Sequence, residues 1–160
     1  MDKIKVIFLD IDGVLNVYCE SRDKYGCKFN PHFVDNLKHI IDETDAKIVI
    51  SSCWKADGLI TLKKMWIDRN LPGEVIDITE GRPDRKRGKE IQQWLDKHKE
   101  EIVDYVIIDD DDVKIKNKEH HFVKTSDNPD HEDCVDIGYG LTKECAEQAI
   151  ILLNKTNITL

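Results

Sequence analysis

The most informative segment of this chain is residues 7–16, which read IFLDIDGVLN. Its apolar start belongs to a continuous run, KVIFL at residues 5–9, that is rich in β-branched side chains. Runs of this kind are typical of strands buried on both faces of a parallel sheet. The predicted strand leads directly into Asp10 and Asp12, and Gly13 follows them. The rest of the sequence has to explain why two carboxyl groups stand at the end of a buried strand.

Strand and helix patterns alternate along the remainder of the chain. We expect further strands at residues 46–51, 74–79, 104–109 and 120–126. Apolar side chains recur at helical spacing in segments 31–44, 54–70, 88–100 and 141–154. This alternation predicts an α/β fold in which helices cover both faces of a central parallel sheet, with right-handed crossovers. Ligands in such folds bind at the carboxyl ends of the strands.

The composition limits the kinds of protein that this chain can be. Its 160 residues, 40% of them hydrophobic, suit one domain spanning residues 1–160. A net charge of −8 disfavours a general nucleic-acid coat protein, because such proteins are usually basic. No apolar run approaches the ~20 residues of a membrane span, and aspartates interrupt the N-terminal apolar stretch that a signal peptide would need. Five cysteines without a CxxC pair favour reduced thiols in a cytoplasmic protein.

Polar residues at the ends of the predicted strands are expected to meet at one edge of the sheet. Asp10 and Asp12 follow the first strand, Ser51 ends the second, and the fourth runs into Asp109 and Asp110. Two unit charges ~4 Å apart repel by about 4 kcal/mol at an effective dielectric of about 20, so a cation must offset these carboxylates. Oxygen ligands without histidine or cysteine favour Mg²⁺, which binds one or two carboxylates together with a substrate phosphate.

These residue types favour phosphoryl transfer. An aspartate can attack phosphorus to form an aspartyl-phosphate, and a second carboxylic acid can protonate the leaving oxygen and later activate water. The D-x-D spacing of Asp10 and Asp12 supplies both groups. Arg87 or Lys89, at the start of the third predicted helix, would hold the phosphate oxygens, and Ser51 would donate a further hydrogen bond.

Four segments resemble, in their order, the phosphatase branch of the haloacid dehalogenase (HAD) superfamily. They are DIDGV at residues 10–14, VISS at 49–52, the basic helix start at 87–89 and IIDDDD at 107–112. Longer forms of these segments, DIDGVLN, SSCWK, RGKEIQQWL and YVIIDDDD, look like the small HAD domains of RNA-repair proteins. The resemblance implies a Rossmann-like three-layer sandwich with a central parallel sheet and a Mg²⁺-dependent phosphatase activity.

The resemblance also implies roles for the matching residues. Asp10 would be the nucleophile and a Mg²⁺ ligand. Asp12 would be the general acid and base, binding Mg²⁺ through its backbone carbonyl. Ser51 would bind the transferring phosphoryl group. Asp109 would bind Mg²⁺ directly, with Asp110 in support.

The other expected site residues allow alternatives. Lys89 corresponds to the basic residue of the third motif, although Arg87 could take the same place. The run of four aspartates leaves the choice of metal ligand ambiguous by one position. Gly13 permits the sharp turn through which backbone amides approach a ligand, and Ser52 is expected beside it as a substrate-binding residue.

The chain leaves room for only a small flap over this site. HAD proteins often insert a cap domain after the first motif, whereas the segment at about 16–30 is long enough for little more than a β-hairpin. An uncapped site admits bulky substrates, so we expect a polynucleotide end or a nucleotide phosphate, with no membrane and no obligate protein partner. Basic residues at 82–89 could guide a polyanion, and Tyr18, Tyr25 and Phe29 could stack on a base.

Three other interpretations stay open on the residues alone. Asp-Gly pairs are common in turns, so Asp12 and Gly13 could form an ordinary strand-end turn. A phospho-receiver signalling domain also gathers acidic residues, a hydroxyl and a lysine on a parallel sheet, but in a different order along the chain. A non-catalytic phosphate-binding module would keep the same fold, although the intact set of acidic residues argues against it.

Overall fold

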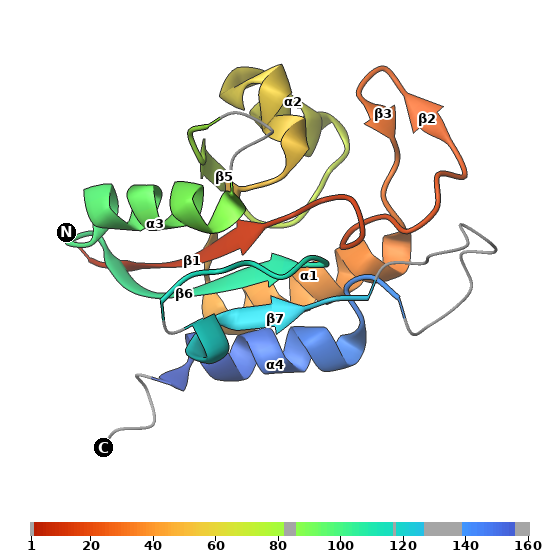
Figure 1. Cartoon of the computed structure of the whole chain (residues 1–160). Helices are drawn as coiled ribbons and strands as arrows, with labels where there is room; N and C mark the ends of the chain where they lie inside the picture. The colour runs from red at the N-terminus through yellow and green to blue at the C-terminus, as the bar shows by residue number, and fades with distance from the viewer. Residues whose placement is uncertain (1, 82–85, 117, 127–138, 156–160) are drawn as a thin grey trace.

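The computed structural model describes residues 2–81, 86–116, 118–126 and 139–155. Its centre is a sheet of parallel strands in the spatial order β5-β4-β1-β6-β7 (Figure 1). The strands are β1 Ile4–Leu9, β4 Lys47–Ile50, β5 Val75–Ile78, β6 Ile102–Asp109 and β7 Phe122–Lys124. Each expected strand is therefore present, and the first along the chain occupies the middle of the sheet.

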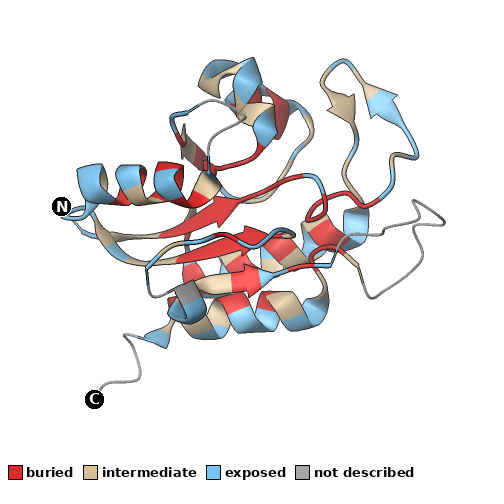
Figure 2. Cartoon of the chain, viewed as in Figure 1, coloured by how far each residue is buried: buried red, intermediate tan, exposed pale blue. Residues whose placement is uncertain are grey.

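Helices cover both faces of this sheet. They are α1 Pro31–Thr44, α2 Leu59–Asp68, α3 Arg87–His98 and α4 Lys143–Leu153. Side chains of α1, α2 and α4 share a core cluster with Ile7 and Leu9, whereas those of α3 share a second cluster with Val6 and Phe8. Successive side chains of β1 point to opposite faces, which divides the core in this way. Figure 2 shows the buried residues concentrated in the strands, and the predicted α/β fold with a central parallel sheet is confirmed.

The second expected helix, residues 54–70, is divided into two elements. A 3₁₀ helix, η1, spans Cys53–Asp57, and α2 begins at Leu59. Gly58 separates them with φ +87°, a left-handed conformation that interrupts a right-handed helix and that favours glycine. Among the described residues, no helix has both the length and the apolar character that crossing a bilayer would demand. Of the polar, irregular segment that the sequence indicates at residues 127–140, residues 127–138 lie outside the described residues.

A short hairpin stands apart from the main sheet (Figure 1). Its antiparallel strands are β2 Arg22–Asp23 and β3 Gly26–Cys27. The hairpin lies inside the segment at about 16–30 where the sequence predicts a flap, and we call residues 18–29 the flap below. Its position beside α2 and η1 brings it close to the carboxyl edge of the sheet.

The flap contains a disulfide, which corrects one expectation from the sequence. Cys19 and Cys27 are bonded to each other, so the prediction that the cysteines are reduced is wrong for this pair. The reason is local geometry, because the hairpin brings their Cα atoms to 5.5 Å, within the usual range for a disulfide. Cys53 and Cys145 are free thiols. Cys134 lies outside the described residues.

Candidate active site

The carboxyl ends of three neighbouring strands place predicted site residues at one edge of the sheet. The strands β4, β1 and β6 end in register. The backbone ladder continues past their ends, because Asp10 N donates to Ile108 O at 3.0 Å and Ser51 N donates to Leu9 O at 3.0 Å. Asp109 is the last residue of β6. These backbone hydrogen bonds fix the positions of Asp10 and Ser51 without help from their side chains.

Three carboxyl groups gather at this edge. Oxygens of Asp10, Asp109 and Asp110 lie within 4.8 Å of one another. Asp10 is 4% exposed and Asp109 is fully buried. Burial, followed by the charge of Asp109 and a hydrogen bond with Asp110, raises the pKa of Asp10 well above its ordinary value. Nearby positive charge would therefore stabilise this cluster of carboxyl groups.

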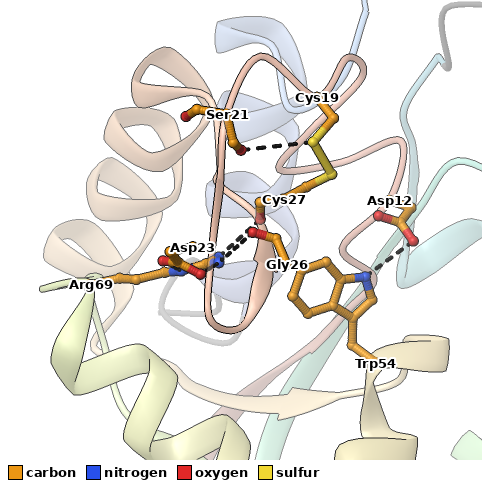
Figure 3. Close-up of a disulfide and its surroundings, with 8 residues drawn as sticks. All are labelled: Asp12, Cys19, Ser21, Asp23, Gly26, Cys27, Trp54 and Arg69. Carbon is orange, nitrogen blue, oxygen red and sulfur yellow. Dashed lines mark hydrogen bonds and ion pairs between the residues drawn. A yellow bond between two sulfur atoms is a disulfide. The ribbon is translucent and has the colours of Figure 1, made fainter.

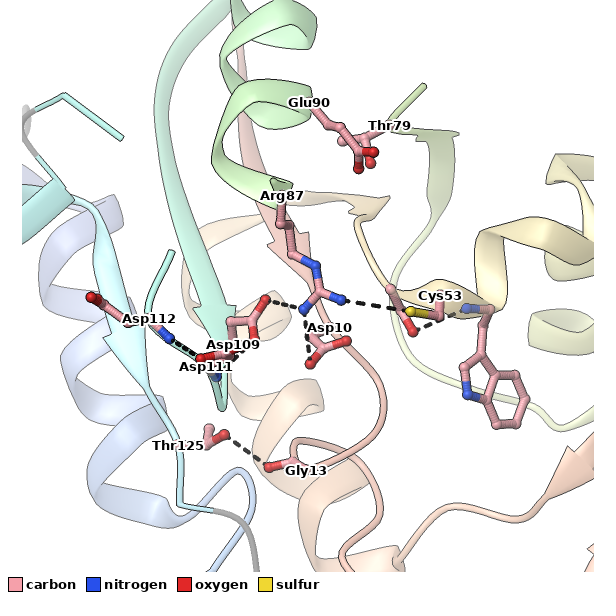
Figure 4. Close-up of polar contacts among 12 residues, drawn as sticks. Asp10, Gly13, Cys53, Thr79, Arg87, Glu90, Asp109, Asp111, Asp112 and Thr125 are labelled. Carbon is pink, nitrogen blue, oxygen red and sulfur yellow. Dashed lines mark hydrogen bonds and ion pairs between the residues drawn. The ribbon is translucent and has the colours of Figure 1, made fainter. Parts of the chain in front are cut away.

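Arg87, the first residue of α3, supplies one positive charge to this cluster (Figure 4). Its Nη1 lies 2.5 Å from Asp109 Oδ2 and 3.3 Å from Asp10 Oδ2. Burial alone would lower the pKa of Arg87, but the two carboxylates raise it above its ordinary value, so the guanidinium stays charged. Lys89, two residues further along α3, is exposed. Of the two basic candidates, the structure brings Arg87 to the carboxylates.

Gly13 shapes the loop that follows Asp10. It has φ +81°, and a Cβ atom at this position would lie 2.3 Å from Asp110 Oδ2. Glycine therefore leaves the space that Asp110 occupies. Gly13 N donates to Asn16 O at 2.8 Å, and Thr125 Oγ1 donates to Gly13 O at 2.8 Å. The expected amide donor is thus engaged within the loop, and the contribution of Gly13 is the turn and the space beside it.

The two serines that follow β4 are both buried but differ in their contacts. Ser51 Oγ has no hydrogen-bond partner within the described part of the chain, although the residue is only 1% exposed. A buried hydroxyl without a partner is costly, which suits a group that donates to a bound ligand. Ser52 Oγ accepts a hydrogen bond from Trp54 N at 3.2 Å and so caps η1.

An open pocket of about 360 Å³ lies at this edge of the sheet. Its lining residues are Asp10, Asp12, Ser52, Cys53, Arg87, Asp110 and Asp111. Five of them were expected from the sequence, whereas Cys53 and Asp111 were not. The predicted site residues Ser51 and Lys89 do not belong to the lining. A pocket of this size holds a phosphoryl group together with part of its ester.

Trp54 and Lys55, which follow the pocket residue Cys53 in η1, make contacts that were not predicted. Trp54 Nε1 donates to Asp12 Oδ2 at 3.1 Å. Lys55 forms a buried ion pair with Glu90, which ties η1 to the start of α3, and its Nζ also lies 3.2 Å from Thr79 Oγ1. The segment SSCWK marks Trp54 and Lys55 as part of a motif, but their partners lie 42 and 35 residues away along the chain. No pattern in the sequence identifies those partners.

The donor set of this site fits a divalent cation. Three carboxylates provide hard oxygen ligands, and two of the three residues are buried. Asp10, Asp109 and Asp110 would hold such an ion, and its charge would offset both the burial and the repulsion from Asp109 that raise the pKa of Asp10.

Comparison with known proteins agrees with this geometry. Residues 6–129 match the family described as HAD domain in Swiss Army Knife RNA repair proteins. No curated protein and no solved structure shows a significant match to the chain. The matched segment includes the ends of β1, β4 and β6 and the start of α3, which together build the pocket. It covers most of the chain, which therefore belongs to this family of HAD domains of RNA-repair proteins.

Proposed function

We propose that this protein is a Mg²⁺-dependent phosphomonoesterase that works through an aspartyl-phosphate on Asp10. The observation that carries the proposal is the position of the Asp10 carboxylate. It lies in a three-carboxylate cluster, 3.3 Å from the charged guanidinium of Arg87, and it lines an open pocket. A nucleophile held by backbone hydrogen bonds at a strand end needs little reorganisation before it attacks.

The proposed reaction uses the two aspartates in turn. A carboxylate oxygen of Asp10 bonds to phosphorus as the bond from phosphorus to the ester oxygen breaks, and Asp12 gives that oxygen a proton. Asp12 then takes a proton from water as the water oxygen bonds to phosphorus and the bond to Asp10 breaks. Inorganic phosphate leaves, and both carboxyl groups return to their starting states.

The other residues of the site would bind and balance charge. Mg²⁺, when bound to Asp10, Asp109 and Asp110, would supply positive charge to the phosphoryl oxygens. The Ser51 hydroxyl and the Arg87 guanidinium would donate hydrogen bonds to those oxygens. Arg87 would give up part of its contact with Asp109 as it turns to the phosphate.

The preferred substrate in this proposal is a polynucleotide end or a nucleotide phosphate. The description of the matched family, which places these domains in RNA repair proteins, favours this class. The pocket is open, and the described part of the segment between β1 and α1 holds only a small hairpin. Lys86 and Lys89 are exposed at the start of α3, whereas Arg82 and Arg85 lie outside the described residues. Tyr18 is 45% exposed on the flap.

The activity itself has a simple test. Purified protein with Mg²⁺ should hydrolyse p-nitrophenyl phosphate, and Asp10→Asn should remove turnover. Asp35→Asn, which makes the same change at an exposed position of α1, is the matched control and should keep full activity. Unchanged turnover in Asp10→Asn would refute the proposal. A stable phosphoprotein without turnover would support a phospho-receiver domain instead.

A substrate panel tests the preferred class. It compares 3′- and 5′-phosphorylated oligoribonucleotides, nucleotides, sugar phosphates and phosphopeptides. We expect the highest kcat/KM for an oligonucleotide end. If oligonucleotide ends are no better than small esters, the preference for nucleic acid is wrong while the phosphatase assignment stands.

A further inference from the structure

The indole of Trp54 contacts the proposed acid and base of the reaction. Trp54 Nε1 lies 3.1 Å from Asp12 Oδ2, and Figure 3 shows the indole N–H directed at that carboxyl group. Asp12 is exposed, whereas Asp10 and Asp109 are buried. An exposed aspartate samples several rotamers, so a donor from a fixed ring selects one of them.

The Trp54 ring packs against the flap and against Arg69, the residue that follows α2. The ring centroids of Trp54 and Phe29 are 5.6 Å apart, and the guanidinium of Arg69 lies 5.9 Å from the Trp54 ring. A Cβ atom on Gly26 would lie 3.4 Å from the Trp54 ring, so the hairpin backbone passes close to the indole. The indole is therefore held between Phe29, Arg69 and the flap backbone.

The flap is fastened to α2 at the same place. Arg69 Nη2 and Nε donate to the two carboxylate oxygens of Asp23 at 2.6 and 2.9 Å, and Nη1 donates to Cys27 O at 3.1 Å (Figure 3). Tyr25 contacts Asp68 through its hydroxyl. The Cys19–Cys27 disulfide closes the hairpin on its other side. These contacts join the flap to the ring that holds Asp12.

We propose that Trp54 is a positioning residue for Asp12, and this inference rests on the proposed function. An indole N–H can only donate a hydrogen bond, so Asp12 Oδ2 is the acceptor in this contact. Oδ1 is then the oxygen that exchanges the proton with the leaving group and with water. The alignment of Asp12 thus depends on the flap, whereas the alignment of Asp10 depends on the strands.

A spectroscopic experiment tests the contact without any turnover. The chain has three tryptophans, and their indole N–H groups donate to Asp12, to Pro72 O and to Asp77. In a ¹H–¹⁵N spectrum assigned with Trp→Phe variants, Asp12→Asn should shift the Trp54 indole signal. The Trp66 and Trp94 signals should keep their positions. A Trp54 signal that stays in place would overturn the inference.

A kinetic experiment tests the role. Protonation of the leaving oxygen matters much for phenyl phosphate and little for p-nitrophenyl phosphate, because nitrophenolate leaves readily. Trp54→Phe should lower kcat/KM for phenyl phosphate about tenfold and for p-nitrophenyl phosphate by no more than about twofold. Trp66→Phe removes an indole N–H from the same aromatic group, where Trp66 lies 6.3 Å from Phe29 between ring centroids, and should leave the ratio unchanged.

A double-mutant cycle separates positioning from a general effect on structure. In an Asp12→Asn background, Trp54→Phe should no longer change the leaving-group ratio, because the group that it positions is already absent. Equal losses on both esters, or an undiminished effect in that background, would overturn the positioning role. If the wild-type protein hydrolyses neither ester, the proposed function fails instead. If Trp54→Phe does not fold, the Asp12→Asn spectrum decides.

Discussion

The acidic site and the flap meet at Asp12, yet they are held in place in different ways. Asp10, Ser51 and Asp109 stand at the ends of adjacent parallel strands, where backbone hydrogen bonds set their positions. The flap is held by contacts between side chains far apart in the sequence, such as Arg69 with Asp23, 46 residues away. Backbone ladders tolerate changes of side chain, whereas the flap depends on the identity of each partner.

This difference predicts two kinds of effect. Changes in the acidic site should alter charge and chemistry while the sheet stays folded. Changes in the flap should leave the nucleophile in place and alter the alignment of Asp12, with smaller losses of turnover.

Among changes that leave the nucleophile in place, the largest effect is expected at Arg87, the charged donor of the acidic site. Arg87→Met should lower kcat about 100-fold, because it removes a charged donor beside the reacting group. The same change at Lys89, which is exposed on the same helix, should cost no more than about twofold. Steady-state kinetics on p-nitrophenyl phosphate measures both. Equal losses at the two positions would mean that the pairing of Arg87 with Asp10 and Asp109 does not describe the working site.

Substitutions at two glycines separate the effect of backbone strain from that of steric overlap with Asp110. Gly13 and Gly58 both have positive φ, but a Cβ atom would overlap Asp110 only at Gly13 and meets nothing within 4 Å at Gly58. Both Gly→Ala variants should lose about 1 to 2 kcal/mol of unfolding free energy through backbone strain. Gly13→Ala alone should also weaken Mg²⁺ binding, by about tenfold in calorimetry, because it displaces a carboxylate. Equal Mg²⁺ affinities in the two variants would contradict this prediction.

In the flap, the disulfide should affect stability more than turnover. Replacing Cys19 and Cys27 with serine reopens a loop of sequence separation 8 and should lower the unfolding free energy by about 2 to 3 kcal/mol. Turnover of p-nitrophenyl phosphate should fall less than in Arg87→Met. Cys145→Ser, which removes a free thiol on α4, is the control. Denaturant titration of all three proteins measures the difference, and an unchanged midpoint in the double variant would show that the disulfide does not stabilise the flap.

The smallest effect is expected when acid protonates Asp23 and weakens the attachment of the flap through Arg69. The hydrogen bond from Arg69 lowers the pKa of Asp23 from 3.8 to about 2. Because the folded pKa lies below the unfolded one, this contact contributes its full stability above pH 3.8 and loses it as the pH falls towards 2. An NMR titration of the Asp23 carboxyl carbon should show a midpoint near 2. A midpoint near 3.8 would show that the flap is not fastened through Arg69.

The strand-end site could be predicted from the sequence because its geometry follows from alternation. Parallel strands end at one edge, so the order of strands and helices along the chain is enough to place Asp10, Ser51 and Asp109 together. The choice between Arg87 and Lys89 could not be predicted, because two residues on a helix differ by about 200° in direction and only the packing of α3 decides which faces the site. Gly58 indicates a break between η1 and α2, because glycine disfavours the interior of a helix. The apolar spacing continues across Gly58 and therefore predicts a single helix.

The flap was expected from the sequence, but its contacts could not be predicted, for a different reason. Its length indicated a hairpin, but five cysteines do not reveal which two will pair. To predict the contact of Trp54 with Asp12, one would need the relative positions of η1, the flap and the loop after β1. Each of these positions depends on tertiary contacts such as Arg69 with Asp23, which leave no periodic pattern in the sequence.

Phosphorylation of Asp10 during turnover is the step on which the proposed function depends most. Acid quenching of the protein while it hydrolyses p-nitrophenyl phosphate with Mg²⁺, followed by peptide mass spectrometry, tests this step directly. We expect one phosphoryl adduct on the peptide that contains Asp10, lost when the quenched sample is made alkaline and not found in Asp10→Asn. An adduct on another residue, under conditions of steady turnover, would contradict the assignment of Asp10 as the nucleophile.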